Sequence, residues 1–344
     1  MPVRGRRADG LVSATGESGP AVGRVTIVMY HYVRQLEGSR YPRIRALPLA
    51  AFHQQLDYIA RHYQVIGAAE LVAAIRGGDP LPPAALLLTF DDGYADHFTH
   101  VLPELERRGW RGSFFPVADA VTRRRMLDVN KLHFVLAAAP DASRLAAEVL
   151  DAVRANRSRL GLDEPAVYEA RCRGDSRYDP PDVTLVKRML QRELPAPLRT
   201  EITDDLFRRF VSGDEAAFAD ELYLSAGQLR EMLDRGMHVG SHGATHRWMN
   251  TLTRDEQAQE IDASLRLLSE LGAPTSDWVM CYPYGGYDAS LLDVVQERGC
   301  AAGLAVRTAV AELGTDDPLA LPRLDTNDLP STPAAEPVEW TRQR

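Results

Sequence analysis

The sequence has few cysteines, no long apolar run and no strong excess of one charge. Its three cysteines, Cys172, Cys281 and Cys300, are widely spaced and form no CxxC pair, so neither a disulfide framework nor a thiolate zinc site is indicated. The longest apolar runs fall well short of the ~20 residues that a membrane span requires. A net charge of −8 disfavours a nucleic-acid partner and an anionic membrane surface.

The first residues lack an export signal of the usual kind. Residues 1–24 contain Arg6-Arg7, but no apolar stretch of about 7–15 residues follows this pair, as a signal peptide would need. Because the segment is rich in Gly, Ser, Ala and Arg, we expect a flexible N-terminal extension. We therefore expect a soluble, cytoplasmic protein, whose oligomeric state the sequence leaves unknown.

Short apolar strands alternate with helical patterns along much of the chain. Apolar runs at residues 25–30, 85–90 and 111–117 are typical of buried strands. Further strands are indicated at residues 237–240, 278–282, 301–306 and 319–324. This alternation predicts an α/β fold with a mostly parallel sheet, in which functional groups gather at the carboxyl ends of the strands.

The alternation is interrupted by a long helical stretch. Between residues 119 and 224 helical patterns dominate, and the spacing of Ser225 and Gln228 predicts a capped helix where the alternation resumes. We therefore predict four parts: an extension at 1–24, a core unit made of 25–118 and 225–330, an all-helical insertion at 119–224, and a C-terminal tail at 331–344.

The strongest chemical signal is Thr89-Phe90-Asp91-Asp92-Gly93 at the end of a buried strand. Adjacent carboxylates at a strand end point in different directions, so one can bind a cation while the other stays free as a base. The glycine permits a sharp turn. The alternative is a solvated Asp-Asp-Gly turn without a catalytic role.

Two further motifs follow predicted strands. His242 and His246 in Ser-His-Gly-Ala-Thr-His can face one cation if the segment between them coils, although they could also be polar loop residues. Two imidazoles and one carboxylate leave a coordination position open for water, as in catalytic sites. The segment from Cys281 to Gly286 contains Pro-Tyr-Gly, which could turn a backbone N–H towards an oxyanion or be an ordinary turn.

In this order and at these strand ends, the three motifs resemble those of the polysaccharide deacetylase superfamily (carbohydrate esterase family 4). The resemblance implies a distorted (β/α) barrel and the hydrolytic removal of an N-acetyl group from an amino sugar or a sugar-containing intermediate. It also implies a divalent metal, most often Zn²⁺, on Asp92, His242 and His246. By the same match, Asp91 is the base and the Tyr284 backbone N–H helps to hold the oxyanion.

The sequence departs from that family at two places. The family's third motif usually begins with an arginine that tethers the base, but Cys281 occupies this position and begins a Cys-Tyr-Pro-Tyr-Gly segment. The family's late Leu-x-His, which supplies the general acid, is absent, because no histidine follows His246. These departures predict an atypical branch.

Residues elsewhere could replace the two missing side chains. His31 follows the first strand, and a group that titrates near neutral pH suits protonation of a leaving amine; the alternative is a histidine packed under a tyrosine. Arg323 could pair with Asp91, and Asp325 could orient His31 or bind substrate, unless the two form a surface salt bridge.

Several side chains could contact the substrate. Tyr94, Tyr287 and Trp248, together with Tyr284, follow the motif ends, where an aromatic face could stack on a sugar ring or pack in the core instead. Lys131 and His133 would line a cleft if the insertion caps the barrel. We expect His97 and His100 at the surface.

The sequence therefore favours a metal-dependent N-deacetylase acting on an N-acetylated sugar or a glycan precursor. One alternative is a metal-dependent amidohydrolase or deformylase that cleaves a different C–N bond. Another is a non-catalytic sugar-binding relative, although the presence of Asp91, Asp92, His242 and His246 together disfavours it.

Overall fold

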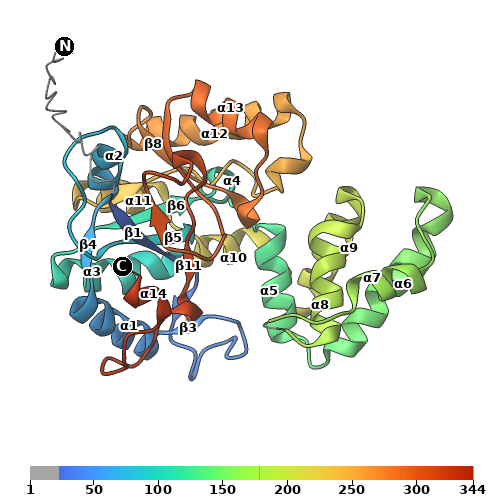
Figure 1. The fold of residues 1–344 in the computed structure, drawn as a ribbon. Helices are drawn as coiled ribbons and strands as arrows, with labels where there is room; N and C mark the ends of the chain where they lie inside the picture. The colour runs from blue at the N-terminus through green and yellow to red at the C-terminus, as the bar shows by residue number, and fades with distance from the viewer. Residues whose placement is uncertain (1–22, 178, 344) are drawn as a thin grey trace, which may run out of the picture.

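A mostly parallel sheet forms the centre of the larger lobe in the computed structural model, which describes residues 23–177 and 179–343 (Figure 1). Residues 1–22 of the expected extension lie outside the described residues. The sheet contains β1 (Arg24–Tyr30), β4 (Gln64–Ile66), β5 (Ala85–Asp92), β6 (Gly112–Pro116), β7 (His238–Val239), β10 (Ala311–Glu312) and β11 (Leu324–Asp325). β10 runs antiparallel to β1, and the other pairings in this sheet are parallel.

Two further strands extend the pairing around the lobe. β8 (Trp278–Cys281) and β9 (Cys300–Leu304) form a parallel pair. Single parallel bridges join Ser241 to Met280 and Leu304 to Leu321. Pairing therefore continues from β7 through β8 and β9 to the chain just before β11, which pairs with β1. The predicted α/β fold with a distorted (β/α) barrel is confirmed, and the single bridges are the source of its irregularity.

β5 is the strand that carries the acidic motif, and all eight of its residues are buried. It pairs with β1 on one side and with β6 on the other, which explains its apolar sequence. The strand continues two residues beyond the predicted end at residue 90, because Asp91 and Asp92 pair in register with Phe115 and Pro116. Both carboxylates are therefore placed by the sheet itself.

Helices surround the strands on the outside of the larger lobe. They are α1 (Leu49–His62), α2 (Ala68–Ile75), α3 (Leu102–Arg108), α11 (Ala226–Asp234), α12 (Arg254–Leu271) and α13 (Ala289–Glu297). The predicted capping box is present, since Ser225 Oγ accepts from the Gln228 backbone N–H and Gln228 Oε1 accepts from the Ser225 N–H. A small parallel pair, β2 (Val33–Arg34) and β3 (Leu47–Pro48), precedes α1.

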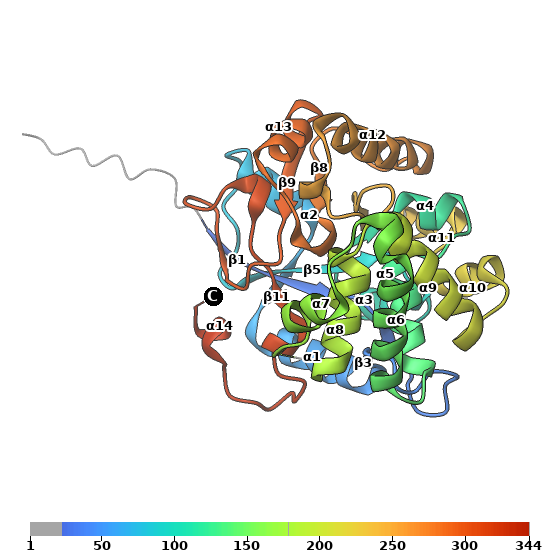
Figure 2. The same cartoon turned by 90° about the vertical axis from the view of Figure 1, so that its right-hand side faces the viewer.

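Most of the stretch between β6 and α11 forms a lobe of helices beside the barrel (Figure 1), and this lobe faces the viewer in Figure 2. It contains α5 (Asp128–Ala138), α6 (Ala142–Leu160), α7 (Pro165–Cys172), α8 (Pro181–Arg188), α9 (Ala196–Phe210) and α10 (Glu215–Leu222). The short helix α4 (Ala118–Thr122) precedes them and lies against the barrel, where the Ala118 and Asp119 N–H groups donate to the Gly243 and Ala244 oxygens. Buried apolar residues of these helices, such as Val149, Leu185 and Phe207, form one cluster that also includes Tyr32 and Tyr94 of the barrel. The helical lobe and the barrel therefore share a core.

The last residues return to the barrel. α14 (Glu339–Arg342) brings Thr341 into a buried position against α1, where the Tyr58 and Thr341 hydroxyls lie 2.7 Å apart. Among the helices of the described chain, none is both long enough and apolar enough to span a lipid bilayer.

Candidate metal and catalytic site

Asp92, His242 and His246 converge at the carboxyl ends of β5 and β7. Asp92 Oδ1 lies 3.4 Å from His242 Nε2 and 3.3 Å from His246 Nε2, and all three side chains are buried. Both Asp92 and His246 adopt left-handed backbone conformations, with φ of 68° and 58°. Such conformations are costly for residues other than glycine and often occur at functional sites.

The three side chains fit a divalent cation. Asp92 Oδ1 is buried and has no hydrogen-bond partner among the described residues, which is an expensive arrangement unless another group occupies the space. His242 Nδ1 lies 2.7 Å from the Cys281 backbone oxygen, so it carries the proton and its Nε2 lone pair is free to coordinate. One carboxylate oxygen and two imidazole nitrogens are suitable ligands for zinc.

A second possible donor group shares one of these ligands. Asp91, His242 and Cys281 also bring their donor atoms within 4.8 Å of one another. However, Arg323 occupies both oxygens of Asp91, and burial raises the pKa of the Cys281 thiol. The donor atoms of Asp92, His242 and His246 are therefore the better fit to a metal.

Asp91 is paired with Arg323. The guanidinium donates from Nη1 to Asp91 Oδ1 at 3.0 Å and lies 2.9 Å from Oδ2 through Nη2, with both side chains almost fully buried. Arg323 Nε also donates to the Ala305 backbone oxygen at 2.9 Å, which fixes its orientation. Burial alone would raise the pKa of Asp91, but the charges of Arg323, His242 and His31 lower this pKa to about 2.

Arg323 pairs with Asp91 in place of the motif-three arginine that the resemblance leads us to expect at Cys281. Arg323 itself lies just before β11, while Cys281 is fully buried at the end of β8. The pairing that we inferred from the absence of the motif-three arginine is present in the structure. The catalytic role of Arg323 stays a prediction.

His31 lies beside Asp91 in the pocket that also contains the histidine pair. Its Nε2 is 4.0 Å from Asp91 Oδ2, and its side chain is 42% exposed, so the ring is open to a ligand. The His31 backbone oxygen lies 2.8 Å from His97 Nε2. The expectation that His97 is a surface residue is wrong, because His97 begins the helical turn before α3 and is fully buried against the end of β1.

Two predicted site residues lie elsewhere. Asp325 accepts hydrogen bonds from the backbone and side chain of Asn327 and caps the turn at Thr326–Asp328, and within the described chain no hydrogen bond or ion pair joins it to His31. Tyr287 packs on Tyr282, with ring centroids 5.2 Å apart, and does not line the pockets around the site. The structure therefore does not place Asp325 where it could orient His31, and it does not place Tyr287 where it could contact a sugar in these pockets.

Tyr94 begins a directed hydrogen-bond chain into the helical lobe. Its Oη donates to Asp92 Oδ2 and accepts from Asn130 Nδ2 at 2.7 Å. Asn130 Oδ1 accepts from Tyr223 Oη at 2.6 Å, and Tyr223 Oη accepts from the Leu127 backbone N–H at 3.0 Å. Because a backbone N–H can only donate and an ionised carboxylate can only accept, the direction of each bond is fixed.

This hydrogen-bond chain contradicts the predicted contact of Tyr94 with a sugar ring. The side chain is fully buried and stacks on Tyr32 at a centroid distance of 4.0 Å, so it cannot also stack on a sugar. Its bond to Oδ2 leaves Oδ1 of Asp92 directed at the two histidines. Tyr94 and Asn130 therefore position a candidate metal ligand.

A pocket of about 350 Å³ contains the site, which we call the central pocket. The barrel contributes His31, Asp91, Asp92, His242, His246, Tyr284 and Arg323, and the helical lobe contributes Val129, His133, Lys187 and Gln191. Burial, followed by the charge of Lys187, lowers the pKa of His133 to about 3, so this imidazole is neutral. Lys131 is fully buried instead and pairs with Asp204 and Glu215.

Trp248 and Tyr284 form an aromatic wall of the central pocket. Their rings stack with centroids 4.6 Å apart and an angle of 6°, and the Tyr284 ring also lies against His246. Tyr284 has a positive φ of 56° in the turn after β8. Both residues lie where the sequence placed substrate contacts, and their contact with a sugar stays a prediction.

The fold and this arrangement define an α/β barrel protein with a candidate divalent-metal centre. Comparisons with known proteins show which proteins it is similar to. Residues 209–303, which include His242 and His246, match the family model described as polysaccharide deacetylase. A poly-beta-1,6-N-acetyl-D-glucosamine N-deacetylase of Escherichia coli (strain K12) is 33% identical over 103 residues, which are 30% of this chain and 15% of that protein. The chain thus spans a small part of this relative's length.

Solved structures share the fold over most of the chain. The deacetylase PplD of Streptococcus pyogenes has a TM-score of 0.57 at 15% identity, over 91% of this chain and 96% of that one. IcaB from Ammonifex degensii has a TM-score of 0.53 at 19% identity, over 88% and 91% of the two chains. With the family match, these likenesses confirm the resemblance to the polysaccharide deacetylase superfamily.

The pairing of Asp91 with Arg323 generates a stability prediction. Arg323→Met leaves a buried carboxylate without its counter-charge, so the variant should lose about 3–5 kcal/mol of unfolding free energy at neutral pH. The control is Arg307→Met, which breaks an exposed pair with Asp316 and should cost about 0–1 kcal/mol. Urea unfolding of both variants measures the difference.

The pH dependence of that loss has a definite sign. In the native protein Arg323 lowers the pKa of Asp91, so the pair stabilises the fold above the unfolded pKa of ~4 and loses this contribution as the pH falls towards 2. Without Arg323 burial raises the pKa of Asp91. The difference in unfolding free energy between the native protein and Arg323→Met should therefore become smaller as the pH falls. A difference that does not depend on pH would contradict the ionised Asp91–Arg323 pair.

Proposed function

We propose that this chain is a metal-dependent hydrolase that removes the N-acetyl group from an amino sugar. The observation that carries the proposal is the central pocket itself. It combines a candidate cation site on Asp92, His242 and His246 with a carboxylate, Asp91, that is held ionised beside it. The family match and the similarity to a sugar N-deacetylase support the same reaction.

A divalent cation on the three ligands would lower the pKa of a bound water and polarise the acetyl carbonyl. Asp91 accepts the water proton, and Arg323 orients this carboxylate and keeps it ionised. The Tyr284 backbone N–H, on the wall of the same pocket, is the proposed donor to the oxyanion. His133 and Gln191 of the helical lobe line the pocket from the other side.

His31 is the proposed general acid. Its Nε2 lies 4.0 Å from Asp91 Oδ2, so both groups can reach one substrate, and the proton that Asp91 takes from water can pass to His31 after His31 has given its own proton to the departing nitrogen. As the C–N bond breaks, Nε2 donates a proton to the leaving amine. The products are acetate and a free amino sugar.

Acetate release tests the proposed reaction. Protein treated with a chelator should release no acetate from N-acetylglucosamine oligomers, and Zn²⁺ should restore the release. An Asp91→Asn variant that retains its metal should be at least about 10²-fold slower, because the proton acceptor is lost. Formate release from N-formyl substrates without acetate release would favour a deformylase, and metal-independent activity would overturn the proposal.

His31→Ala tests the general acid. We expect kcat to fall by about 10²–10⁴-fold while zinc content, measured by atomic emission, stays normal. His53→Ala is the control, because His53 is an exposed histidine on α1. Equal turnover of the His31→Ala and His53→Ala variants would reject His31 as the acid.

Tyr94→Phe tests how the helical lobe supports the metal ligands. Removing the hydroxyl leaves Asp92 Oδ2 without its donor, so zinc affinity should fall by about 10–100-fold in a chelator competition titration. Tyr58→Phe is the matched control, since it also removes a buried hydroxyl but one bonded to Thr341 at the far end of α1. Similar zinc affinity in both variants would show that Tyr94 has no positioning role.

A further inference from the structure

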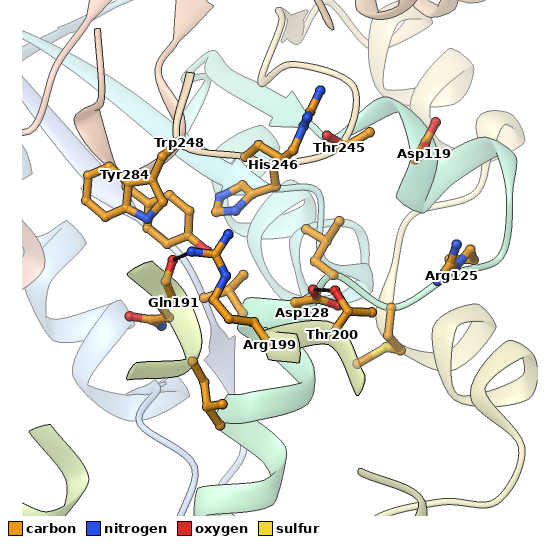
Figure 3. A pocket seen from close by; sticks show the side chains of 15 residues that line it. Asp119, Arg125, Asp128, Gln191, Arg199, Thr200, Thr245, His246, Trp248 and Tyr284 are labelled. Carbon is orange, nitrogen blue, oxygen red and sulfur yellow. Dashed lines mark hydrogen bonds between the residues drawn. The ribbon is translucent and has the colours of Figure 1, made fainter. Parts of the chain in front are cut away.

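A second pocket lies between the barrel and the helical lobe, and its volume is about 400 Å³ (Figure 3). We call it the side pocket. The helical lobe lines it with Arg125, Asp128, Gln191, Arg199 and Thr200, and the barrel lines it with Thr245, His246, Arg247, Trp248 and Tyr284. Gln191, His246, Trp248 and Tyr284 also line the central pocket, so the two spaces adjoin.

Arg199 is the unusual residue of the side pocket. The other cationic side chains that line the two pockets each have a carboxylate oxygen within 4.0 Å; they are Arg125, Lys187, Arg247 and Arg323. Among the described residues, Arg199 has no such partner. It is half-buried and always charged, and a partly desolvated cation without a counter-charge is unfavourable.

The Arg199 guanidinium is nevertheless held in a fixed place. Its Nη1 donates to the backbone oxygens of Gln191 and Arg192, at 3.1 and 3.0 Å. Figure 3 shows the side chain extending from α9 towards Tyr284 and His246. These bonds use one of its three nitrogens, so the remaining donors of a pre-positioned fork are left for a planar or tetrahedral oxyanion.

The acidic groups of the side pocket are already engaged. Asp128 Oδ2 accepts a hydrogen bond from Thr200 Oγ1 at 2.8 Å, and Asp128 lies in the first turn of α5, where the helix dipole stabilises a negative charge. Asp119 forms an ion pair with Arg123, in which Asp119 Oδ1 lies 3.2 Å from Arg123 Nε. No ion pair joins either carboxylate to Arg199 in the described chain. Burial lowers the pKa of Arg199 and outweighs the more distant charge of Asp128, which favours the charged form, so an anion at the free donors of Arg199 would still be stabilised.

The aromatic wall links this charge to the reaction centre. Trp248 and Tyr284 stack on each other and line both pockets, and Arg192 lies over the Trp248 ring at 5.1 Å. A sugar whose acetamide group lies in the central pocket would pass along this wall. A substituent on that sugar, or on its neighbour, would then reach Arg199.

We propose that the side pocket binds a carboxylate or phosphate group of the substrate on Arg199, so that the preferred substrate is an anionic N-acetyl amino sugar. This inference rests on the proposed deacetylase function. It identifies the helical lobe as the part of the chain that selects the substrate. Carboxylate and phosphate share the chemistry that Arg199 recognises, and the choice of probes separates them.

The test compares three probes: N-acetylglucosamine, N-acetylglucosamine 1-phosphate, and a disaccharide of N-acetylglucosamine and glucuronic acid. For the native zinc-loaded protein, kcat/KM should be about 10–100-fold higher for one anionic probe than for the neutral one, as expected for a charge-assisted hydrogen bond. The favoured probe identifies phosphate or carboxylate. In the Arg199→Gln variant, the ratio of kcat/KM for the favoured anionic probe to kcat/KM for the neutral probe should fall by the same factor.

Two further variants make the result interpretable. Arg199→Lys keeps the charge but not the fork, so its ratio should lie between those of the native protein and Arg199→Gln. Arg157→Gln is the control, because Arg157 is an exposed arginine of the helical lobe paired with Glu164, and its ratio should match the native one. An unchanged ratio in a folded Arg199→Gln variant would overturn the inference.

A binding measurement separates this inference from the proposed function. Calorimetry with N-acetylglucosamine 1-phosphate and with the uronate disaccharide should give a Kd at least about tenfold weaker for Arg199→Gln than for the native protein. If acetate release fails but this difference is found, the side pocket is an anion site and the deacetylase function is wrong. If acetate is released but Arg199→Gln changes neither the Kd for the anionic probes nor the kcat/KM ratio, the deacetylase function stands and the proposed anion site on Arg199 is wrong.

Discussion

Two adjacent buried carboxylates at the end of β5 are the constraint on which the rest of the site depends. Burying one ionised carboxylate is costly unless it is paired, and here two follow each other in the chain. Because alternate residues of a strand point to opposite sides, each needs its own partner. Asp91 has Arg323, and Asp92 has Tyr94 on one oxygen and two imidazoles on the other. The two carboxylates therefore differ in chemistry although they are neighbours.

The partners of these carboxylates connect the whole molecule to the site. Arg323 comes from the chain that completes the ring of strands, so the closure of the barrel by β11 on β1 also delivers the counter-charge of Asp91. Asn130 comes from the helical lobe and fixes Tyr94, which fixes Asp92. The lobe is thus part of the support of the candidate metal ligand as well as a wall of the pocket.

The sequence was informative wherever chemistry lay within one short segment. The motifs around Asp92 and His242 follow strands that are apolar enough to recognise, and parallel strands bring their carboxyl ends together. Arg323 was found through the missing motif-three arginine at Cys281. The sequence does not reveal the burial of His97 and Tyr94, because a polar side chain on a helix or turn suggests exposure until its partner, a backbone oxygen or a carboxylate, is known.

Asn130 and Arg199 could not be found in this way, because their roles depend on how the helical lobe docks on the barrel. Asn130 shares a helix face with Phe134, which indicates burial but does not identify its partners. Arg199 is one arginine among many, and it becomes distinctive only when the ion pairs of its neighbours are known. Since the lobe supplies one residue that holds a candidate ligand and another that carries an unpaired charge, its docking would couple the two proposed properties, metal binding and substrate choice. A change in the packing of α5 against α9 would therefore alter both together.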